Sequence, residues 1–217
     1  MSDAARHEAL IDALGAELTP VRRLAPPWRR ALGWLLVVAI IALVLFARYG
    51  ASTMLHRWAM APDLGWAACG AGLTAITATL AAFVLAVPGR SVKWAWLPVP
   101  GALLWIGGSG MGCLREWVVP GMQVANMHAA NHCLIFIVSF SIPLSALLIW
   151  LLRRACPLRP VLTAVLVGLA SAAASASLLE ICHNFDAAAT DLLMHALAVA
   201  IVIVVNASMG GRLLSKA

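Results

Sequence analysis

Six apolar runs constrain the fold of this chain more than any other feature of its sequence. They cover residues 31–47, 64–87, 94–112, 133–152, 161–181 and 192–209. Each is about 17–24 residues long, and a helix needs roughly 20 apolar residues to cross a hydrocarbon core of about 30 Å. The chain of 217 residues is 63% hydrophobic and only 11% charged, whereas soluble domains are about 45–50% apolar and about 25% charged. The sequence therefore predicts an all-α fold, a polytopic membrane bundle of six transmembrane helices at residues 31–217.

Small residues and prolines modify these runs. Gly108 and Gly112 are spaced four apart, and residues 171–177 are all alanine or serine. Small faces of this kind let helices approach closely in lipid. Pro98 and Pro143 fall inside the third and fourth runs, where we expect each to kink its helix without abolishing it.

Residues 1–30 form the one long segment that looks soluble, and they contain an amphipathic pattern. The large apolar side chains of residues 4–18 fall on one helical face and are Leu10, Ile11, Leu14 and Leu18. Their spacing predicts a short helix with one apolar stripe, to which Val21 adds a further contact residue. So short a helix is marginal alone in water. The stripe therefore needs a partner, which can be the membrane surface, its own bundle or another protein.

The distribution of Lys and Arg predicts the orientation. With six crossings and a cytoplasmic N-terminus, the inner side carries Arg6, Arg22, Arg23, Arg29, Arg30, Arg90, Lys93, Arg153, Arg154, Arg159, Arg212 and Lys216. The outer side carries only Arg48, Arg57 and Arg115. Because cytoplasmic loops are enriched in Lys and Arg, both termini are predicted to lie inside. The net charge of +6 is thus explained by topology and lipid contact rather than by nucleic-acid binding.

The same orientation gathers thiols and imidazoles at the outer side. The cysteines there are Cys113, Cys133 and Cys182, and the histidines are His56, His128, His132, His183 and His195. Glu180, Asp186 and Asp191 lie near the same edge. Thiolate and imidazole together suit copper, zinc and similar ions. We therefore predict a metal or redox site there, formed by Cys133, Cys182, His132 and His183, with His128, His195, Asp186 and Cys113 as further candidates.

Cys133 begins the fourth run and Cys182 ends the fifth, so two runs of nearly equal length return both sulfurs to about the same membrane level. If the cysteines lie on facing sides of neighbouring helices, their Cα atoms can approach the roughly 4.4–6.8 Å of a disulfide. The sequence does not distinguish three states of Cys133 and Cys182, which are a structural disulfide, a sensory dithiol and a metal complex. No resident cofactor is predicted, and copper, cadmium and zinc are candidates for a sensed ion.

Four segments of the chain resemble a known protein family. The sequence LIDALGAELTPVRRLAPPW at residues 10–28, together with GCLREW at 112–117, NHCL at 131–134 and RRACPLRP at 153–160, is similar to NrsF-type negative regulators of the sigma factor SigF. The resemblance implies a six-span inner-membrane anti-sigma factor whose N-terminal segment holds an extracytoplasmic-function sigma factor. It also implies that two periplasm-side cysteines, here Cys133 and Cys182, respond to stress, with metal stress the usual context. The chain departs from the family's His-Cys-Pro context, because Cys182 lies between Ile181 and His183.

Two hypotheses from different classes follow. In the first, a non-enzymatic anti-sigma factor binds its partner through the stripe of Leu10, Ile11, Leu14, Leu18 and Val21 and releases it when the outer site changes state. In the second, the chain is a membrane metal transporter or a thiol-disulfide redox protein. The second is disfavoured because the runs carry few polar residues and the sequence has no C-x-x-C pair. The sequence leaves the oligomeric state open.

Overall fold

The computed structural model of the chain describes residues 3–17, 24–118, 127–182 and 189–215, without the side chains at 113, 115–117, 127–130 and 189–191. Its helices are α1 (Asp3–Ala16), α2 (Pro27–Tyr49), α3 (Ser52–Met60), α4 (Pro62–Leu85), η1 (Val92–Trp96), α5 (Val99–Val118), α6 (Met127–Arg153), α7 (Pro160–Cys182), α8 (Ala189–Val205), η2 (Asn206–Gly210) and α9 (Gly211–Ser215). The described part of the chain contains no strand, in agreement with the all-α prediction.

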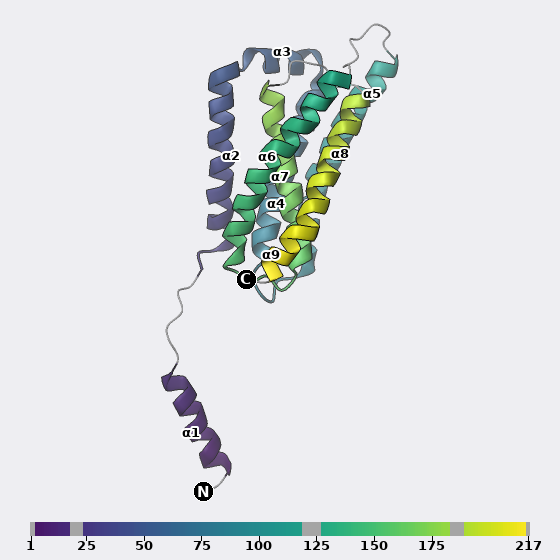
Figure 1. Ribbon diagram of the computed structural model, residues 1–217. Coiled ribbons are helices and arrows are strands. Elements are labelled where there is room, and N and C mark those ends of the chain that lie inside the picture. The colour runs from purple at the N-terminus through teal and green to yellow at the C-terminus, as the bar shows by residue number, and fades with distance from the viewer. Residues whose placement is uncertain (1–2, 18–23, 119–126, 183–188, 216–217) are drawn as a thin grey trace.

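The bundle is formed by the long helices α2, α4, α5, α6, α7 and α8, which run along a common direction (Figure 1). Neighbouring helices in the chain alternate in direction, and α3 lies across one end of the bundle, which we call the α3 end. α1 stands clear of the bundle beyond the opposite end, where the C-terminus also lies. α4 and α7 form the centre, since they carry most of the buried residues.

Among the described residues, five helical segments are long and apolar enough to cross a membrane. They are Pro27–Tyr49, Pro62–Leu85, Asn131–Arg153, Pro160–Cys182 and Leu192–Ser215. α5 also extends along the bundle (Figure 1), but it is not among the segments that meet this test within the described residues. The sixth crossing therefore remains a prediction.

The third apolar run was predicted with the wrong boundaries. Residues Val92–Trp96 form the 3₁₀ turn η1, and α5 begins only at Val99. Pro98 thus precedes the helix instead of kinking it, which suits a residue that has no backbone N–H to donate. Pro143 does lie inside α6, as predicted.

Serine and alanine let α7 occupy the middle of the bundle. Its residues from Ser171 to Ala176 are all buried. The Ser175 hydroxyl donates to the carbonyl oxygen of Ser171 at 2.8 Å, and the Ser141 hydroxyl of α6 lies 3.1 Å from the Ser175 hydroxyl. These small side chains allow close helix contact, and the Ser175 hydroxyl finds partners on its own helix and on α6, as a polar group buried in a membrane bundle requires.

α4 and α5 approach so closely that a glycine is required between them. A Cβ atom built on Gly70 would lie 2.3 Å from the backbone nitrogen of Trp105, and one built on Gly108 would lie 2.6 Å from that of Ala67. The predicted role of Gly108 in close packing is therefore confirmed. Gly72, only two residues from Gly70, has nothing within 4 Å of the same position.

This difference gives a matched pair of substitutions. Gly70→Ala forces α4 and α5 apart, so we expect it to lower the free energy of unfolding by about 1–3 kcal/mol. Gly72→Ala meets open space and replaces a poor helix former, so we expect no loss and a gain of up to about 1 kcal/mol. Reversible unfolding in mixed detergent micelles measures both changes. Equal losses for the two variants would contradict the close approach of α4 and α5.

α2 is the most lightly packed of the long helices. Its buried residues are Ala31 and Trp34, both in its first half. The Trp34 indole nitrogen donates to the carbonyl oxygen of Leu144 at 3.0 Å. The Arg30 guanidinium donates to the carbonyl oxygen of Leu151 and lies 4.9 Å from the centre of the Phe83 ring. These contacts fix the beginning of α2 to α6 and α4.

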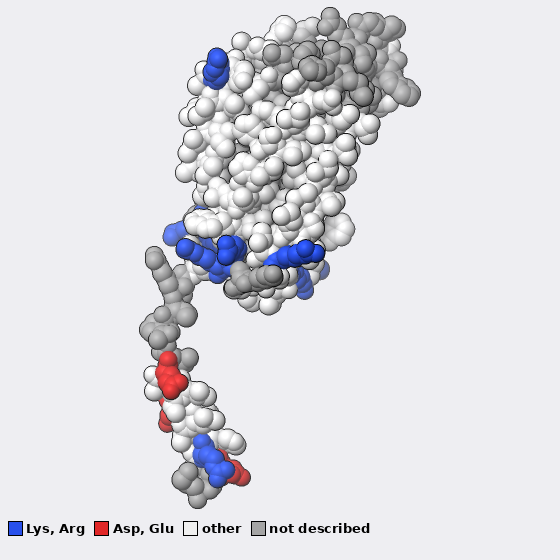
Figure 2. Space-filling model, viewed as in Figure 1, with Lys and Arg blue, Asp and Glu red and all other residues white. Residues whose placement is uncertain are grey.

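Basic residues collect at the end opposite α3, which we call the basic end (Figure 2). The described Lys and Arg residues in the segments at this end are Arg29, Arg30, Arg90, Lys93, Arg153, Arg154, Arg159 and Arg212. The bundle segments at residues 24–30, 86–98, 153–160 and 206–217 contain no Asp or Glu. The basic end therefore has an uncompensated positive charge.

Candidate functional site

The first candidate site is the apolar stripe of α1. Leu10, Ile11 and Leu14 expose 56%, 67% and 58% of their surface, and no residue of α1 is buried. The helix carries one ion pair of its own, in which a nitrogen of Arg6 lies 3.6 Å from an oxygen of Asp3. Leu18 and Val21 lie outside the described residues. α1 thus presents three large apolar side chains on one face that its own bundle does not cover (Figure 1).

The second candidate site lies at the α3 end of the bundle, where α3 places an arginine in the interior. Met54 and Arg57 are the buried residues of α3. A nitrogen of the Arg57 guanidinium lies 3.6 Å from an oxygen of the Glu180 carboxylate, near the end of α7. The side chains expose only 8% and 22% of their surface. This ion pair connects α3 to α7 in a partly dry environment, where charges interact more strongly than at the surface.

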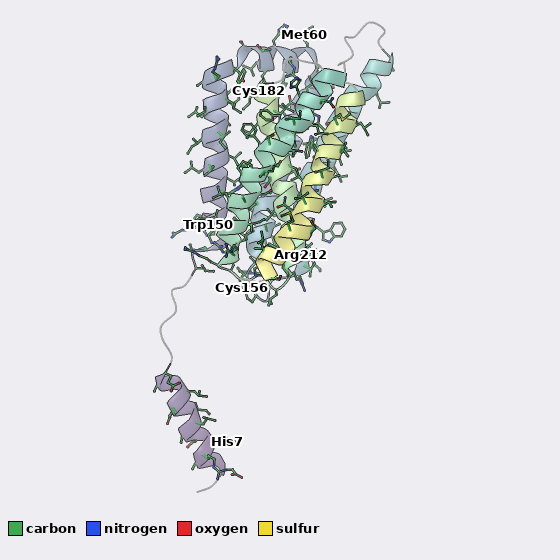
Figure 3. The ribbon with its side chains drawn as sticks, viewed as in Figure 1. His7, Met60, Trp150, Cys156, Cys182 and Arg212 are labelled. Carbon is green, nitrogen blue, oxygen red and sulfur yellow. The ribbon has the colours of Figure 1, made fainter. Side chains whose placement is uncertain are left out.

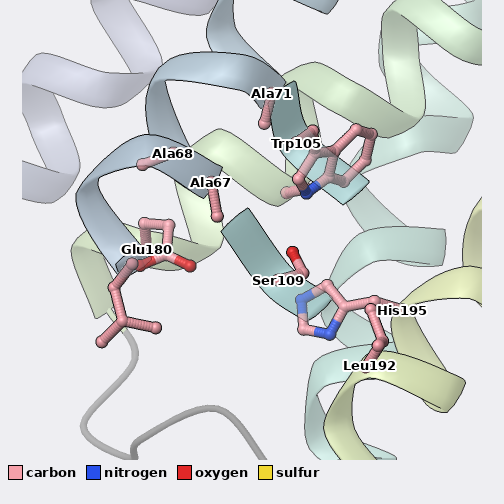
Figure 4. A pocket seen from close by; sticks show the side chains of 10 residues that line it. Ala67, Ala68, Ala71, Trp105, Ser109, Glu180, Leu192 and His195 are labelled. Carbon is pink, nitrogen blue, oxygen red and sulfur yellow. The ribbon is translucent and has the colours of Figure 1, made fainter. Parts of the chain in front are cut away.

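Glu180 also lines a small pocket between α4, α5, α7 and α8. The pocket holds about 40 Å³, which suffices for one or a few water molecules. Ser109 of α5 and His195 of α8 are the other polar side chains that line it. Figure 4 shows Glu180 and His195 on opposite sides of the pocket, with Ser109 beside His195. The arrangement brings a carboxylate and an imidazole to the same cavity from separate helices.

Cys133 faces the interior. It exposes only 2% of its surface and packs in a cluster with Ile137 of α6, Ala176 and Leu179 of α7, and Ala198 of α8. Its neighbour His132 is exposed, because successive residues of a helix point about 100° apart. The adjacent imidazole and thiol of α6 therefore point in different directions.

Cys182 lies at the last residue of α7, near α3 (Figure 3). It is half-buried and packs against the larger apolar cluster, which includes Met54, Trp58 and Ile181. Its thiol lies 3.7 Å from the carbonyl oxygen of Leu178. The two thiols thus occupy the same end of the bundle, as predicted, but they pack in different apolar clusters.

Within the described residues, no three side chains of the metal-binding types come together. No disulfide joins the described cysteines Cys69, Cys133, Cys156 and Cys182. His183 and Asp186 lie outside the described residues. Cys113, His128 and Asp191 lie in α5, α6 and α8, but their side chains are not described. The predicted four-residue metal site therefore stays a prediction.

Sequence reasoning used Arg57 only to orient the chain and did not predict α3. The signal was present, since Met54, Trp58 and Ala61 recur at helical spacing between two apolar runs. The segment is short and its mean hydropathy is reduced by His56 and Arg57, so it does not stand out as a structural element. The sequence places Glu180 near the same outer edge as the thiols, but its proximity to Arg57 could not be read from the sequence.

The fold and these two sites define a polytopic helical membrane protein with an exposed helix outside its bundle. No curated protein matches the chain in a sequence search, and no solved structure matches it. The family model NrsF, described as "Negative regulator of sigma F", matches residues 14–215. The chain therefore belongs to the NrsF family of negative regulators of sigma F, whose description implies a sigma factor as partner. The match covers the bundle and Leu14, but not the first turns of α1.

Proposed function

We propose that this protein is an inner-membrane anti-sigma factor that holds an extracytoplasmic-function sigma factor through α1 and releases it when the α3 end of the bundle senses stress. The observation that carries the proposal is the exposed stripe of Leu10, Ile11 and Leu14 on a helix that stands apart from the bundle. An amphipathic helix of this kind can place its apolar face in a groove of a partner protein. Leu18 and Val21 extend the proposed contact surface.

The charge distribution supports an orientation in which the basic end and both termini face the cytoplasm. Basic residues gather at the end of the bundle from which α1 extends (Figure 2), and cytoplasmic segments of membrane proteins are enriched in Lys and Arg. α1 then lies in the compartment that contains the sigma factor and RNA polymerase. The α3 end faces the periplasm, where stress reaches the cell first. This orientation requires α5 to be a sixth crossing.

The sensing half of the proposal assigns Cys133 and Cys182 as the responding thiols, with His132, His183, His128, His195, Asp186 and Cys113 as candidate ligands. Copper, cadmium or zinc ions, or an oxidant, are the candidate signals. Cys133 lies inside a packed cluster, so a metal or an oxidant can reach it only after α6, α7 and α8 separate locally. A ligand that binds only the opened arrangement shifts the bundle toward that arrangement.

α3 and α2 provide a physical connection between the two ends. α7 carries both Cys182 and Glu180, and Glu180 is paired with Arg57 of α3. α3 follows α2 directly in the chain, and α2 leads back through residue 24 toward α1. Because the buried residues of α2 lie in its first half, a shift of α3 can move the second half of α2 at low cost and load the contacts at its beginning. In our proposal this movement changes the access of the sigma factor to α1.

Serine variants of the four described cysteines test the sensing half. We expect Cys133→Ser and Cys182→Ser each to hold sigma-F-dependent transcription at a constant level when metal or peroxide is added to cells. Cys69→Ser and Cys156→Ser are matched controls, because both side chains are exposed and neither belongs to the proposed site, so they should keep the full response. A normal response in both the Cys133 and Cys182 variants would refute the role of these thiols. A reporter gene under a sigma-F promoter gives the measurement.

A further inference from the structure

A groove lies between α6 and the segment formed by α8, η2 and α9. It has a volume of about 460 Å³, within the roughly 300–1,000 Å³ that is usual for ligand sites. Its walls are mostly apolar and include Ile142, Ala146 and Trp150 of α6 and Met209 of η2. Arg153, at the end of α6, lines the mouth of the groove at the basic end. The groove therefore joins an apolar channel to a positive charge.

Close packing at two glycines borders the groove. A Cβ atom built on Gly168 of α7 would lie 2.8 Å from the Cα atom of Ile203, and one built on Gly210 would lie 3.1 Å from the Ile149 side chain and 3.4 Å from the Ala164 side chain. The first contact holds α8 against α7, and the second holds η2 near both α6 and α7. These glycines therefore help to set the position of the α8–η2 wall.

A polar floor holds the two walls of the groove at a fixed separation. Asn206 begins the π-helical turn η2, and its side-chain nitrogen donates to the hydroxyl of Ser145 at 3.0 Å and to the carbonyl oxygen of Val202 at 2.9 Å. Both side chains are buried and line the groove. A π-helical turn inside an α-helix is rare and frequently marks a functional position. The side-chain nitrogen of Asn206 already donates to partners within the protein. These polar groups therefore do not need a polar ligand, and the rest of the groove is an apolar channel.

Positive charge surrounds the mouth without an acidic counterpart. Arg153 ends α6 and Arg154 follows it, while Arg212 lies on α9, which forms the opposite wall through Leu213. The segments 153–160 and 206–217 contain no Asp or Glu. Figure 3 places Arg212 and Trp150 at this end of the bundle, and an indole at such a level is typical of the membrane interface. These segments of the bundle therefore supply no carboxylate side chain to compensate the arginines, which leaves them available to an anionic group of a ligand.

We propose that this groove binds one anionic phospholipid, with an acyl chain between α6 and α8 and the phosphate at Arg153 and Arg212. Guanidinium groups bind phosphate strongly, and both lipid types carry one. The charge distribution selects the anionic lipid, because the ammonium group of a zwitterionic headgroup would be repelled by the arginines. It also disfavours a second copy of the chain. A copy with the same orientation in the membrane would bring its own basic end to the same level, and the two sets of arginines would repel each other.

The experiment uses the full chain in vesicles of equimolar phosphatidylglycerol and phosphatidylcholine, followed by extraction in a mild detergent and native mass spectrometry. We expect one phosphatidylglycerol retained per chain in preference to phosphatidylcholine. Arg153→Gln together with Arg212→Gln should reduce this preference by roughly twenty-five-fold, since each basic residue near an anionic lipid contributes about fivefold. Arg90→Gln is the matched control, because Arg90 is exposed at the same end but lies outside the groove, and it should change little.

A second variant tests the channel independently of charge. Ala146→Trp places an indole in the groove and should remove the retained lipid, whereas Leu103→Trp on the exposed face of α5 should not. Equal retention of both lipids by the unmodified chain would overturn the proposal and indicate only a general lipid shell. A mass of two chains that lacks bound lipid would overturn it in favour of a second copy.

Discussion

Replacing Leu10 and Leu14 together with Asp is expected to abolish the binding of the sigma factor. The two side chains lie one helical turn apart on the stripe of α1 and expose 56% and 58% of their surface. In helix-in-groove complexes a few such anchors carry most of the affinity, and the loss of one typically costs about 2 kcal/mol or more. Two charged replacements should therefore weaken binding by at least about a thousandfold. Co-purification of the full chain with the sigma factor, followed by titration in detergent, measures the change.

Ala9→Asp is the control for this experiment. Ala9 is exposed on α1, and at 100° per residue it lies on the face opposite the stripe. It introduces the same charge without removing an apolar anchor, so binding should stay within a few-fold of the original. Circular dichroism of each variant excludes a general loss of helix. If the Leu10 and Leu14 double variant binds as tightly as the original chain, α1 does not hold the sigma factor through this face.

The long helices could be predicted from the sequence because a membrane crossing imposes a length and a composition on each one. The runs at 31–47, 133–152 and 161–181 each lie within a helix of the structure. The run predicted at 94–112 begins too early, since α5 starts at Val99. Trp94 and Trp96 extend the apolar pattern toward the N-terminus, but they belong to a 3₁₀ turn. Hydropathy reports which residues avoid water, and it does not distinguish a helix from a short turn beside it.

The candidate sites could be predicted only in part, for a related reason. Span lengths indicate the level of a residue in the bundle, so both Cys133 and Cys182 were correctly expected at one end. The rotation of each helix about its axis is set by packing, and it directs Cys133 toward Ala176 and Ala198 while Cys182 packs in another cluster. The same limit applies to the Arg57–Glu180 pair, which depends on how α3 folds back over the bundle.

The Arg57–Glu180 ion pair gives the second prediction with a large expected effect, a loss of stability. Arg57→Met removes the guanidinium that lies 3.6 Å from Glu180 and leaves the carboxylate in a partly dry site without its counter-charge. Breaking a fully buried ion pair costs about 3–5 kcal/mol. Glu180 keeps 22% of its surface exposed, so we expect the smaller loss of about 2–3 kcal/mol in the free energy of unfolding. Reversible unfolding in mixed micelles with increasing denaturing detergent measures it.

Two further variants separate the ion pair from a general effect of lost charge. Arg48→Met removes an exposed arginine in the last turn of α2, at the same α3 end of the bundle. It should change the free energy of unfolding by less than about 0.5 kcal/mol. The double variant Arg57→Met with Glu180→Met removes both charges, and replacing a buried ion pair by apolar side chains is often neutral. We therefore expect the double variant to recover most of the loss. A double variant less stable than either single variant would show that the two side chains stabilise the bundle independently.

The same series distinguishes a structural clamp from a part of the signalling path. If α3 carries the state of the α3 end to α2, Arg57→Met should raise sigma-F-dependent transcription in unstressed cells, because α3 is released from α7. The double variant restores stability but not the charged connection, so transcription should stay high while stability returns. If transcription instead follows stability through the whole series, the pair only holds the bundle together, and the connection between the two ends of the molecule must run through another contact.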